Sequence, residues 1–294
     1  MQDLQNFPKK TYQFQILNRF VDIIYNLQRE MLRRGYSPRT IQTYIFCIKN
    51  FLKFCKKDLN QINKTDIKSY VDKYVDKNSA GNTINVHLNA IKFLFEEILN
   101  RRLTLKIKYS KVPKTLPVFL TKEEIIKLFS VIENEKHKLI LELIYSAGLR
   151  VSEVINLKKE DLEFERNIGW VRKGKGMKDR PFIIAKIIEI KLREYINKNC
   201  VNQNSYLFVG QNKNKLTART VQEIVKYAAK KAGINKKIHP HSLRHSFATH
   251  LIENGHDIAT VQPLLGHNSA ETTLMYVHMA TPKIINIKSP YDSI

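Results

Sequence analysis

Apolar residues recur at three- and four-residue spacing through the first third of the chain, which places them on one face of an α-helix. The first such run ends at Gly35 and has these apolar positions: Ile16, Phe20, Ile23, Ile24 and Leu27. A second helix is predicted after Ser37, because serine is a good N-cap and Pro38 suits the first helical turn.

The pattern continues through two further helices. The second helix has six apolar positions: Ile41, Tyr44, Ile45, Ile48, Phe51 and Leu52. A third helix is predicted to begin near Thr65 and Asp66, and a fourth to run from 79–81 to Leu99. Together these runs predict a four-helix bundle in a first domain, residues 1–103.

Residues 104–118 interrupt the helical pattern. They contain two prolines and four lysines and have no apolar stripe, which predicts an extended basic linker. Such a linker either lets two domains close around a polyanion or serves as an ordinary tether, and the segment alone favours neither.

Residues 119–294 form the predicted second domain, which begins with Thr121 and Glu124 in the spacing of a capping box. A helix that ends at Gly148 follows, and residues 162–185 alternate and turn on glycines, which predicts a small antiparallel sheet with a basic hairpin. Further helices are predicted at 186–198, 217–232, 241–254, 257–265 and 270–278. The fold class is therefore mainly α with a small antiparallel β-sheet.

Charge narrows the range of functions. Among 294 residues, 50 are Lys or Arg and 27 are Asp or Glu, which gives a net charge of +23. Such an excess repels itself unless a polyanion neutralises it, and nucleic acid is the commonest such partner. A generally lysine-rich composition is the alternative explanation.

Cysteine content and hydropathy exclude several other classes. The three cysteines, Cys47, Cys55 and Cys200, form no CxxC pair, so neither a disulfide framework nor a zinc knuckle is indicated, and Cys47 and Cys55 are expected in the core. The N-terminus lacks the apolar core of a signal peptide, and no apolar run is long enough to span a membrane. We expect a cytoplasmic protein without membrane association.

Two arginines are candidates for binding a phosphodiester. Arg150 follows a glycine-marked helix junction, and Arg244 lies three residues after His241 on one helix. The planar guanidinium donates paired hydrogen bonds and keeps its proton, which suits the charge that builds up on an attacked phosphate. Either arginine alone is more typical of an ordinary surface residue or ion-pair partner.

Two histidines are candidates for proton transfer. His241 shares a helix with Arg244, and His267 follows Gly266 at a corner between two helices. His245, His250, His256 and His278 are predicted to be structural. His241 and His245 have a zinc-like spacing, but the HExxH glutamate and a third ligand are missing, so we expect no metal.

Tyr276 is the candidate nucleophile. Two nearby guanidinium groups and a histidine would favour its phenolate form, although by composition alone it would be a packing residue. Lys175, between two glycines at the tip of the basic hairpin, is the candidate that protonates the leaving oxygen. Lys173 and Lys178 are alternatives, and a hairpin that simply grips phosphates is equally consistent with the pattern.

These residues lie in five segments that follow one another along the chain: AGLRVSEVINL, GKGMKDR, HPHSLRHSFATHL, VQPLLGH and TTLMYVH. In their order and spacing the chain resembles the tyrosine recombinase family, and most of all its Xer site-specific recombinases and phage integrases. The resemblance covers essentially the whole chain, because residues 1–103 are similar to that family's core-binding domain. It implies a two-domain, C-shaped clamp around double-stranded DNA.

The resemblance also implies a role for each candidate. Arg150 and Arg244 would clamp the scissile phosphate, with Glu153 in the supporting acidic position. Lys175 would protonate the leaving 5′-hydroxyl, His241 would assist Tyr276 as a base, and His267 would hydrogen-bond the phosphate. No metal or cofactor is implied, and a homotetramer, or a heterotetramer with a homologue, would exchange strands between two DNA sites through a Holliday junction.

Two other functions compete with recombination. A type IB topoisomerase uses the same phosphotyrosine chemistry on one duplex, and a DNA-binding regulator would have lost catalysis. The two-domain layout and the LLGH segment favour a recombinase over the first, and the complete residue set argues against the second. Family members dock a C-terminal helix into a neighbouring subunit, whereas here only eighteen residues follow Tyr276 and Pro290 limits any helix among them.

Overall fold

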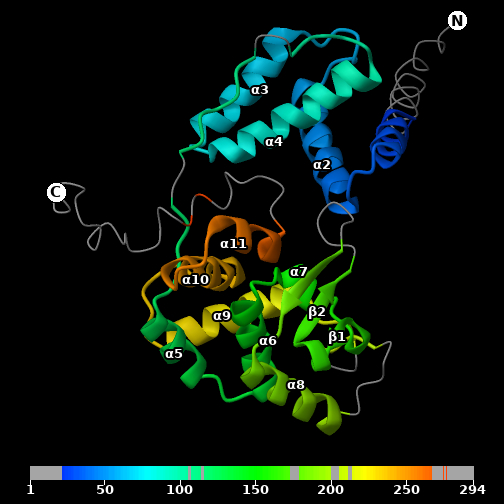
Figure 1. Ribbon diagram of the computed structural model, residues 1–294. Helices are drawn as coiled ribbons and strands as arrows, with labels where there is room; N and C mark the ends of the chain where they lie inside the picture. Colours follow the sequence, from blue (N-terminus) through cyan, green and yellow to red (C-terminus); the bar gives the residue numbers. More distant parts are fainter. Residues whose placement is uncertain are drawn as a thin grey trace, which may run out of the picture. The chain divides into compact units, whose positions relative to one another are not determined.

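The structure, a computed structural model, describes residues 22–104, 107–113, 116–172, 179–199, 205–210, 214–266, 274 and 276. The chain divides into two compact units, Met1–Lys114 and Thr115–Ile294, and each has its own core (Figure 1). The described residues are mostly helical with one small sheet, which confirms the predicted fold class.

The first unit contains the predicted helices. The described part of its first helix spans residues 22–33, and the others are α2 (Pro38–Cys55), α3 (Lys64–Asp76) and α4 (Gly81–Lys92). The last predicted turn differs, because α4 continues as a π-helical segment, η1 (Phe93–Ile98), instead of an α-helix to Leu99.

Side-chain caps fix where these helices begin. The Ser37 hydroxyl accepts a hydrogen bond from the backbone N–H of Thr40, as the serine-proline start predicts. Helix α3 begins slightly earlier than predicted, since Asn63 caps it and the Asp66 carboxylate accepts a hydrogen bond from the Asn63 N–H. Cys47 is buried in the core of this unit, as expected, and Cys55 packs partly buried against it.

The first part of the predicted linker is bound to the first unit. The described residues of this segment form neither helix nor strand, but the Asn85 side chain on α4 accepts from the N–H of Ser110 and donates to its carbonyl oxygen. The Tyr109 hydroxyl also donates to Asn89. These hydrogen bonds hold residues 109–110 against α4, so the segment is not a free tether at this point.

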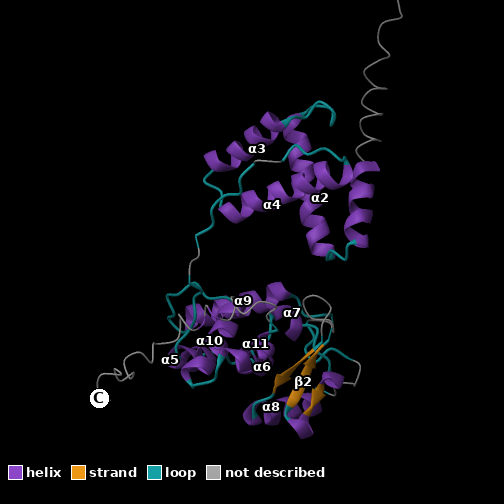
Figure 2. Cartoon of the chain, turned by 45° about the horizontal axis from the view of Figure 1, so that its top comes forward, coloured by secondary structure: helices purple, strands orange, loops and turns teal. Residues whose placement is uncertain are grey.

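The second unit is built from helices with a small sheet on one side (Figure 2). Its helices are α5 (Lys122–Ser130), α6 (Glu135–Ala147), α7 (Val151–Val154), α8 (Lys186–Lys198), α9 (Ala218–Lys231), α10 (Pro240–Glu253) and α11 (Ile258–Leu265), with 3₁₀ turns η2 (Lys159–Asp161) and η3 (Phe164–Arg166). The predicted capping box of Thr121 and Glu124 is present at α5. Gly148 ends α6 in the left-handed conformation, also as predicted.

Three short strands form the predicted antiparallel sheet: β1 (Leu162–Glu163), β2 (Ile168–Val171) and β3 (Arg180–Ile183). The sheet lies to one side of the helices, near α8 (Figure 2). Phe182 on β3 points into the core with Ile188 and Leu192 of α8. The tip of the predicted hairpin, 173–178, lies outside the described residues.

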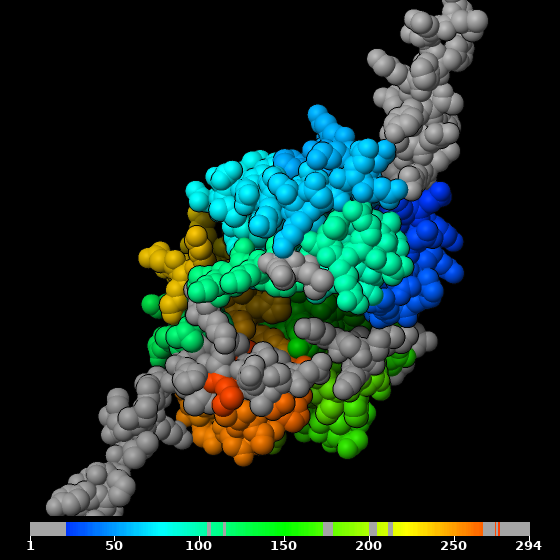
Figure 3. Space-filling view, turned by 90° about the horizontal axis from the view of Figure 1, so that it is seen from above, coloured from blue at the N-terminus to red at the C-terminus, as the bar shows by residue number. Residues whose placement is uncertain are grey.

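A smaller hydrophobic cluster joins α10, α11 and Tyr276. It contains Phe247, Ala248, Val261, Leu265 and Tyr276, all buried. The orange surface in Figure 3 belongs to the end of α10 and to α11, the two helices that supply Phe247, Ala248, Val261 and Leu265. Of the predicted helix 270–278, only Leu274 and Tyr276 are described, and both are helical.

Candidate functional site

Arg150 is held at the junction of α6 and α7. Because Gly148 ends α6, Arg150 becomes the N-cap of the short helix α7. Its backbone N–H donates to Oε2 of Glu153 at 2.7 Å, and its Nη1 donates to Oε1 of the same carboxylate at 2.8 Å. One turn of helix thus fixes both the backbone and the guanidinium of Arg150.

Arg244 lies buried on α10, with 3% of its side chain exposed. Its Nη1 donates to the carbonyl oxygen of Gly148, and its Nη2 donates to that of Leu265. Burial, and next the positive charge of Arg150, lowers the pKa of Arg244 to about 10, so the guanidinium remains cationic at neutral pH.

A third arginine, which was not predicted from the sequence, completes this arrangement. Arg180 at the start of β3 donates through Nη2 to Oε2 of Glu153 at 2.7 Å and through Nη1 to the carbonyl oxygen of Leu264. Burial lowers its pKa, and the charge of Glu153 opposes that shift. Its place at the end of the GKGMKDR segment was the available signal, but nothing in the spacing relates it to Glu153.

The three arginines meet at the C-terminal end of α11. Arg180, Arg244 and Arg150 donate to three successive carbonyl oxygens, those of Leu264, Leu265 and Gly266. Carbonyl groups in the last turn of a helix lack intrahelical partners and carry partial negative charge, which the arginines compensate. Glu153, 9% exposed, supplies the full negative charge that lets three cations gather.

His241 and His245 lie one helical turn apart on α10. The His241 and His245 rings lie 6.4 Å apart between centroids. His241 is exposed overall, but its ring has lost part of its hydration, and this lowers its pKa. The positive charges of His239, Arg244 and Arg150 lower this pKa further. Burial lowers the pKa of His245 to about 4, and the positive charges of His241, His239 and Arg244 contribute to the same shift. His245 is therefore neutral at pH 7.

Tyr276 is buried, with 1% of its surface exposed, and its hydroxyl lies 2.9 Å from Nδ1 of His245. Burial raises the pKa of Tyr276, whereas the charges of Arg244 and Arg150 lower it. His245, which the sequence predicts to be structural, is thus a hydrogen-bond partner of the tyrosine hydroxyl.

The structure brings together most of the predicted site. Arg150, Glu153 and Arg244 are in one network, and His241 and Tyr276 interact electrostatically with its arginines. Lys175, its alternatives Lys173 and Lys178, and His267 lie outside the described residues. Where the chain is described, no three His, Cys, Asp or Glu side chains gather as a metal site, and no helix is long and apolar enough to cross a bilayer.

This arrangement has the chemistry of an anion site beside a candidate nucleophile. Buried guanidinium groups fixed by Glu153 and by helix carbonyls are preorganised to stabilise charge on a phosphate. A phenol whose ionisation the same arginines favour is suited to attack such a group.

Comparison with known proteins agrees with that chemistry. Residues 118–282 match the phage integrase family, and residues 23–105 match the N-terminal SAM-like domain of phage integrases. The chain is 38% identical over 264 residues to tyrosine recombinase XerA of Pyrococcus horikoshii, which covers 88% of this chain and 90% of that protein. It is 33% identical over 283 residues to tyrosine recombinase XerD of Oceanobacillus iheyensis, at 88% and 94% coverage.

A solved structure extends the likeness to three dimensions. The crystal structure of XerH site-specific recombinase bound to palindromic difH substrate, a post-cleavage complex, matches with a TM-score of 0.73 at 27% identity, covering 88% of this chain and 82% of that one. The chain belongs to the phage integrase family and is a tyrosine site-specific recombinase.

Proposed function

We propose that this recombinase cuts and rejoins double-stranded DNA at two specific sites through a 3′-phosphotyrosyl intermediate and a Holliday junction, without metal or ATP. The observation that carries the proposal is the juxtaposition of Tyr276 with the cluster of Arg150 and Arg244 around Glu153. Residues 1–103 are assigned to DNA binding, 104–118 to a basic linker and 119–294 to catalysis, in a tetramer of this chain or with a homologue acting in the cytoplasm.

The proposed reaction is a transesterification. The Tyr276 oxygen forms a bond to the scissile phosphorus, and the bond from phosphorus to the 5′ oxygen breaks. Arg150 and Arg244 stabilise the non-bridging oxygens, with His267 as a further hydrogen-bond donor. His241 assists removal of the tyrosine proton, and Lys175 protonates the departing 5′ oxygen. Attack by a 5′-hydroxyl from the partner duplex reverses these steps.

The biological role we favour is Xer-type resolution of DNA dimers. The support is the identity of 33–38% to Xer recombinases along 88% of this chain. Integration or excision of a mobile element is the second candidate, because residues 118–282 match the phage integrase family.

The test begins with duplexes that the wild-type protein selects from fragmented host DNA. A nicked version of a selected duplex should trap a covalent protein–DNA complex, in excess chelator as well as without it. Tyr276→Phe should abolish this complex and preserve binding. Trapping by the phenylalanine variant, or strict dependence on magnesium, would overturn the mechanism. Relaxation of supercoiled DNA that lacks the selected site would indicate a topoisomerase instead.

A further inference from the structure

His245 is a hydrogen-bond partner of Tyr276 that the proposed roles do not use. Nδ1 of His245 lies 2.9 Å from the Tyr276 hydroxyl, and the two rings are 5.6 Å apart between centroids. We propose that His245 is a positioning residue, whose Nδ1 accepts the hydrogen bond of the Tyr276 hydroxyl and holds that oxygen beside the arginine cluster. The inference rests on Tyr276 being the nucleophile.

The direction of this hydrogen bond follows from the protonation state. His245 is neutral at pH 7, so only one ring nitrogen has a hydrogen. The phenolic O–H is the better donor of the two groups, which favours the tautomer with its hydrogen on Nε2 and a lone pair on Nδ1 facing Tyr276. A tyrosine held this way keeps its hydrogen pointed at the histidine and its oxygen lone pairs free of that bond.

Helix geometry makes His245 suited to positioning. It sits between Arg244 and Ser246, both buried on α10, so its backbone is fixed by the core. Because its pKa is low, His245 does not readily accept a proton at neutral pH. Its positioning role is therefore distinct from the proton transfer proposed for the more exposed His241. Misplacing a reacting atom by about 1 Å can cost about 100-fold in rate, so one hydrogen bond of this kind has a large effect on cleavage.

The hydrogen bond is tested without DNA by ¹⁵N NMR of histidine-labelled protein. His245→Asn identifies the His245 signals by their loss. We expect His245 to have an unprotonated Nδ1 whose signal shifts in Tyr276→Phe. A hydrogen on Nδ1, or no shift in that variant, would overturn the inference whatever the protein does to DNA.

The positioning role is tested by the single-turnover rate of covalent-complex formation on the selected nicked duplex. His245→Ala should be about 100-fold slower with unchanged duplex affinity, whereas His245→Asn, whose amide oxygen replaces Nδ1 as an acceptor, should stay close to wild type. His245→Gln, of similar polarity but with its amide beyond Nδ1, should resemble alanine and serves as the matched control. An alanine variant as fast as wild type or faster would contradict the proposal, as would equal rates for Asn and Gln.

A substrate with sulfur in place of the 5′ bridging oxygen separates positioning from leaving-group protonation. Sulfur departs without a proton, so it should rescue loss of Lys175 but not His245→Ala. Rescue of His245→Ala would assign His245 to the leaving group and overturn the inference. If the wild-type protein forms no covalent complex on any duplex, the proposed function fails, and the NMR experiment still decides the hydrogen bond.

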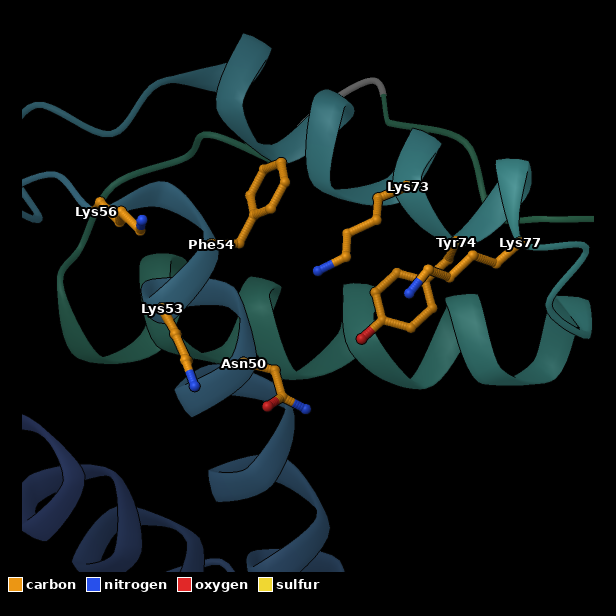
Figure 4. Close-up of a pocket in the computed structure, with 7 residues that line it drawn as sticks. All are labelled: Asn50, Lys53, Phe54, Lys56, Lys73, Tyr74 and Lys77. Atoms are coloured by element: carbon orange, nitrogen blue, oxygen red, sulfur yellow. The ribbon is translucent and has the colours of Figure 1, made fainter.

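A separate observation concerns the first unit, where a basic pocket of about 580 Å³ lies between α2 and α3 (Figure 4). Lys53 and Lys56 reach it from the end of α2, and Lys73 and Lys77 from the end of α3. None of the four forms an ion pair with another described residue, and no carboxylate lines the pocket. One cation near each helix end suits the helix dipole, but four leave a surplus of positive charge.

One wall of the pocket is polar and is held in place by buried hydrogen bonds. Tyr74 lines it, and its hydroxyl is hydrogen-bonded to that of buried Tyr70 at 3.2 Å. The Tyr70 hydroxyl in turn lies 3.1 Å from Nδ1 of buried His87. Phe54 forms an apolar wall, over which the Lys73 ammonium lies 5.2 Å from the ring centroid. A buried network therefore holds one wall in place while the lysines surround an open space.

We infer that this pocket binds a backbone phosphate of duplex DNA, so that the first unit contributes to the salt-sensitive part of binding. The inference rests on the DNA substrate of the proposed function. Each phosphate that a lysine neutralises releases a counterion, which appears as a steeper dependence of affinity on salt.

The test uses a random-sequence duplex and needs no cognate site. Lys73→Gln/Lys77→Gln should flatten the slope of log affinity against log salt by about 2. The matched control Lys68→Gln/Lys127→Gln removes the same charge from exposed positions outside the pocket and should change the slope less. Equal slopes for the two variants would overturn the inference. The inference would also be overturned if the pocket variant kept its DNA affinity but lost binding to polyglutamate. That result would indicate that the ligand of the pocket is an acidic protein segment. A wild-type protein that binds no duplex would instead refute the proposed function.

Discussion

Nη2 of Arg180 donates a hydrogen bond to Oε2 of Glu153 at 2.7 Å, and the other oxygen of this carboxylate accepts a hydrogen bond from Nη1 of Arg150. Glu153 is therefore the electrostatic centre of the site: its charge allows three arginines to meet at the end of α11. Removing one partner from a buried ionic network costs more than the pair contributes, because the remaining charges lose their compensation.

Glu153→Ala should accordingly destabilise the protein by about 3–5 kcal/mol. The free energy of unfolding in urea measures this loss. Glu165→Ala is the control, since the Glu165 side chain is 93% exposed and pairs with Arg193 at the surface, and it should change stability by no more than about 0.5 kcal/mol. Equal losses of unfolding free energy for the two variants would show that the buried Glu153 network stabilises the protein no more than a surface ion pair does.

Arg244→Lys should keep the charge but lose the paired hydrogen bonds to the Gly148 and Leu265 carbonyl oxygens. We expect the rate of covalent-complex formation to fall about 100- to 1,000-fold, as when one preorganised donor is removed, with duplex affinity little changed. Arg219→Lys, at a side chain that is 78% exposed, should react like wild type. Rapid cleavage by Arg244→Lys would mean that charge alone suffices at this position.

The sequence was sufficient for features that depend on local chemistry. The N-caps at Ser37 and Thr121, the stop at Gly148 and the helix over 186–198 were all predicted, because capping and apolar spacing act within one or two turns. The residue types needed at the site, arginines and a tyrosine, were likewise recognisable by their segments.

The contacts between distant segments were not predictable in this way. His245 and Tyr276 are 31 positions apart, and Arg180 and Glu153 are 27 apart. Only tertiary packing, which places Tyr276 against α10 and β3 beside α7, brings each pair together. His245 looked structural because helical spacing shows which face a residue shares and not which distant side chain reaches it. The π-helical segment Phe93–Ile98 was missed for a similar reason, since its apolar spacing resembles that of an α-helix.

Gly266→Ala tests whether the end of α11 must stay close to the arginines. A Cβ at Gly266 would lie 2.7 Å from Cδ of Arg180, and the residue has φ of +60°. Gly233 is a matched control with φ of +67° and nothing within 4 Å of its Cβ position. Both alanine variants should lose about 1 kcal/mol or more from the left-handed backbone, but only Gly266→Ala should also displace Arg180 and slow covalent-complex formation. Equal rates for the two variants would contradict this.

His245 also predicts how stability depends on pH. Burial, with the positive charges of His241, His239 and Arg244, lowers its native pKa from 6.5 to about 4, and Tyr276 is its hydrogen-bond partner. The unfolded chain therefore binds this proton more readily than the native protein, so the contribution of His245 is intact above about pH 6.5 and is lost as the pH falls toward about 4.

We expect the free energy of unfolding to fall across that window, and His245→Asn, which takes up no proton there, to fall less steeply. Urea unfolding at a series of pH values measures both slopes. His256→Asn, at an exposed histidine, should follow the wild-type profile more closely. Parallel profiles for His245→Asn and wild type between about pH 6.5 and 4 would mean that the imidazole is not held neutral beside Tyr276. The proposed role of this hydrogen bond in positioning Tyr276 would then lose its physical basis.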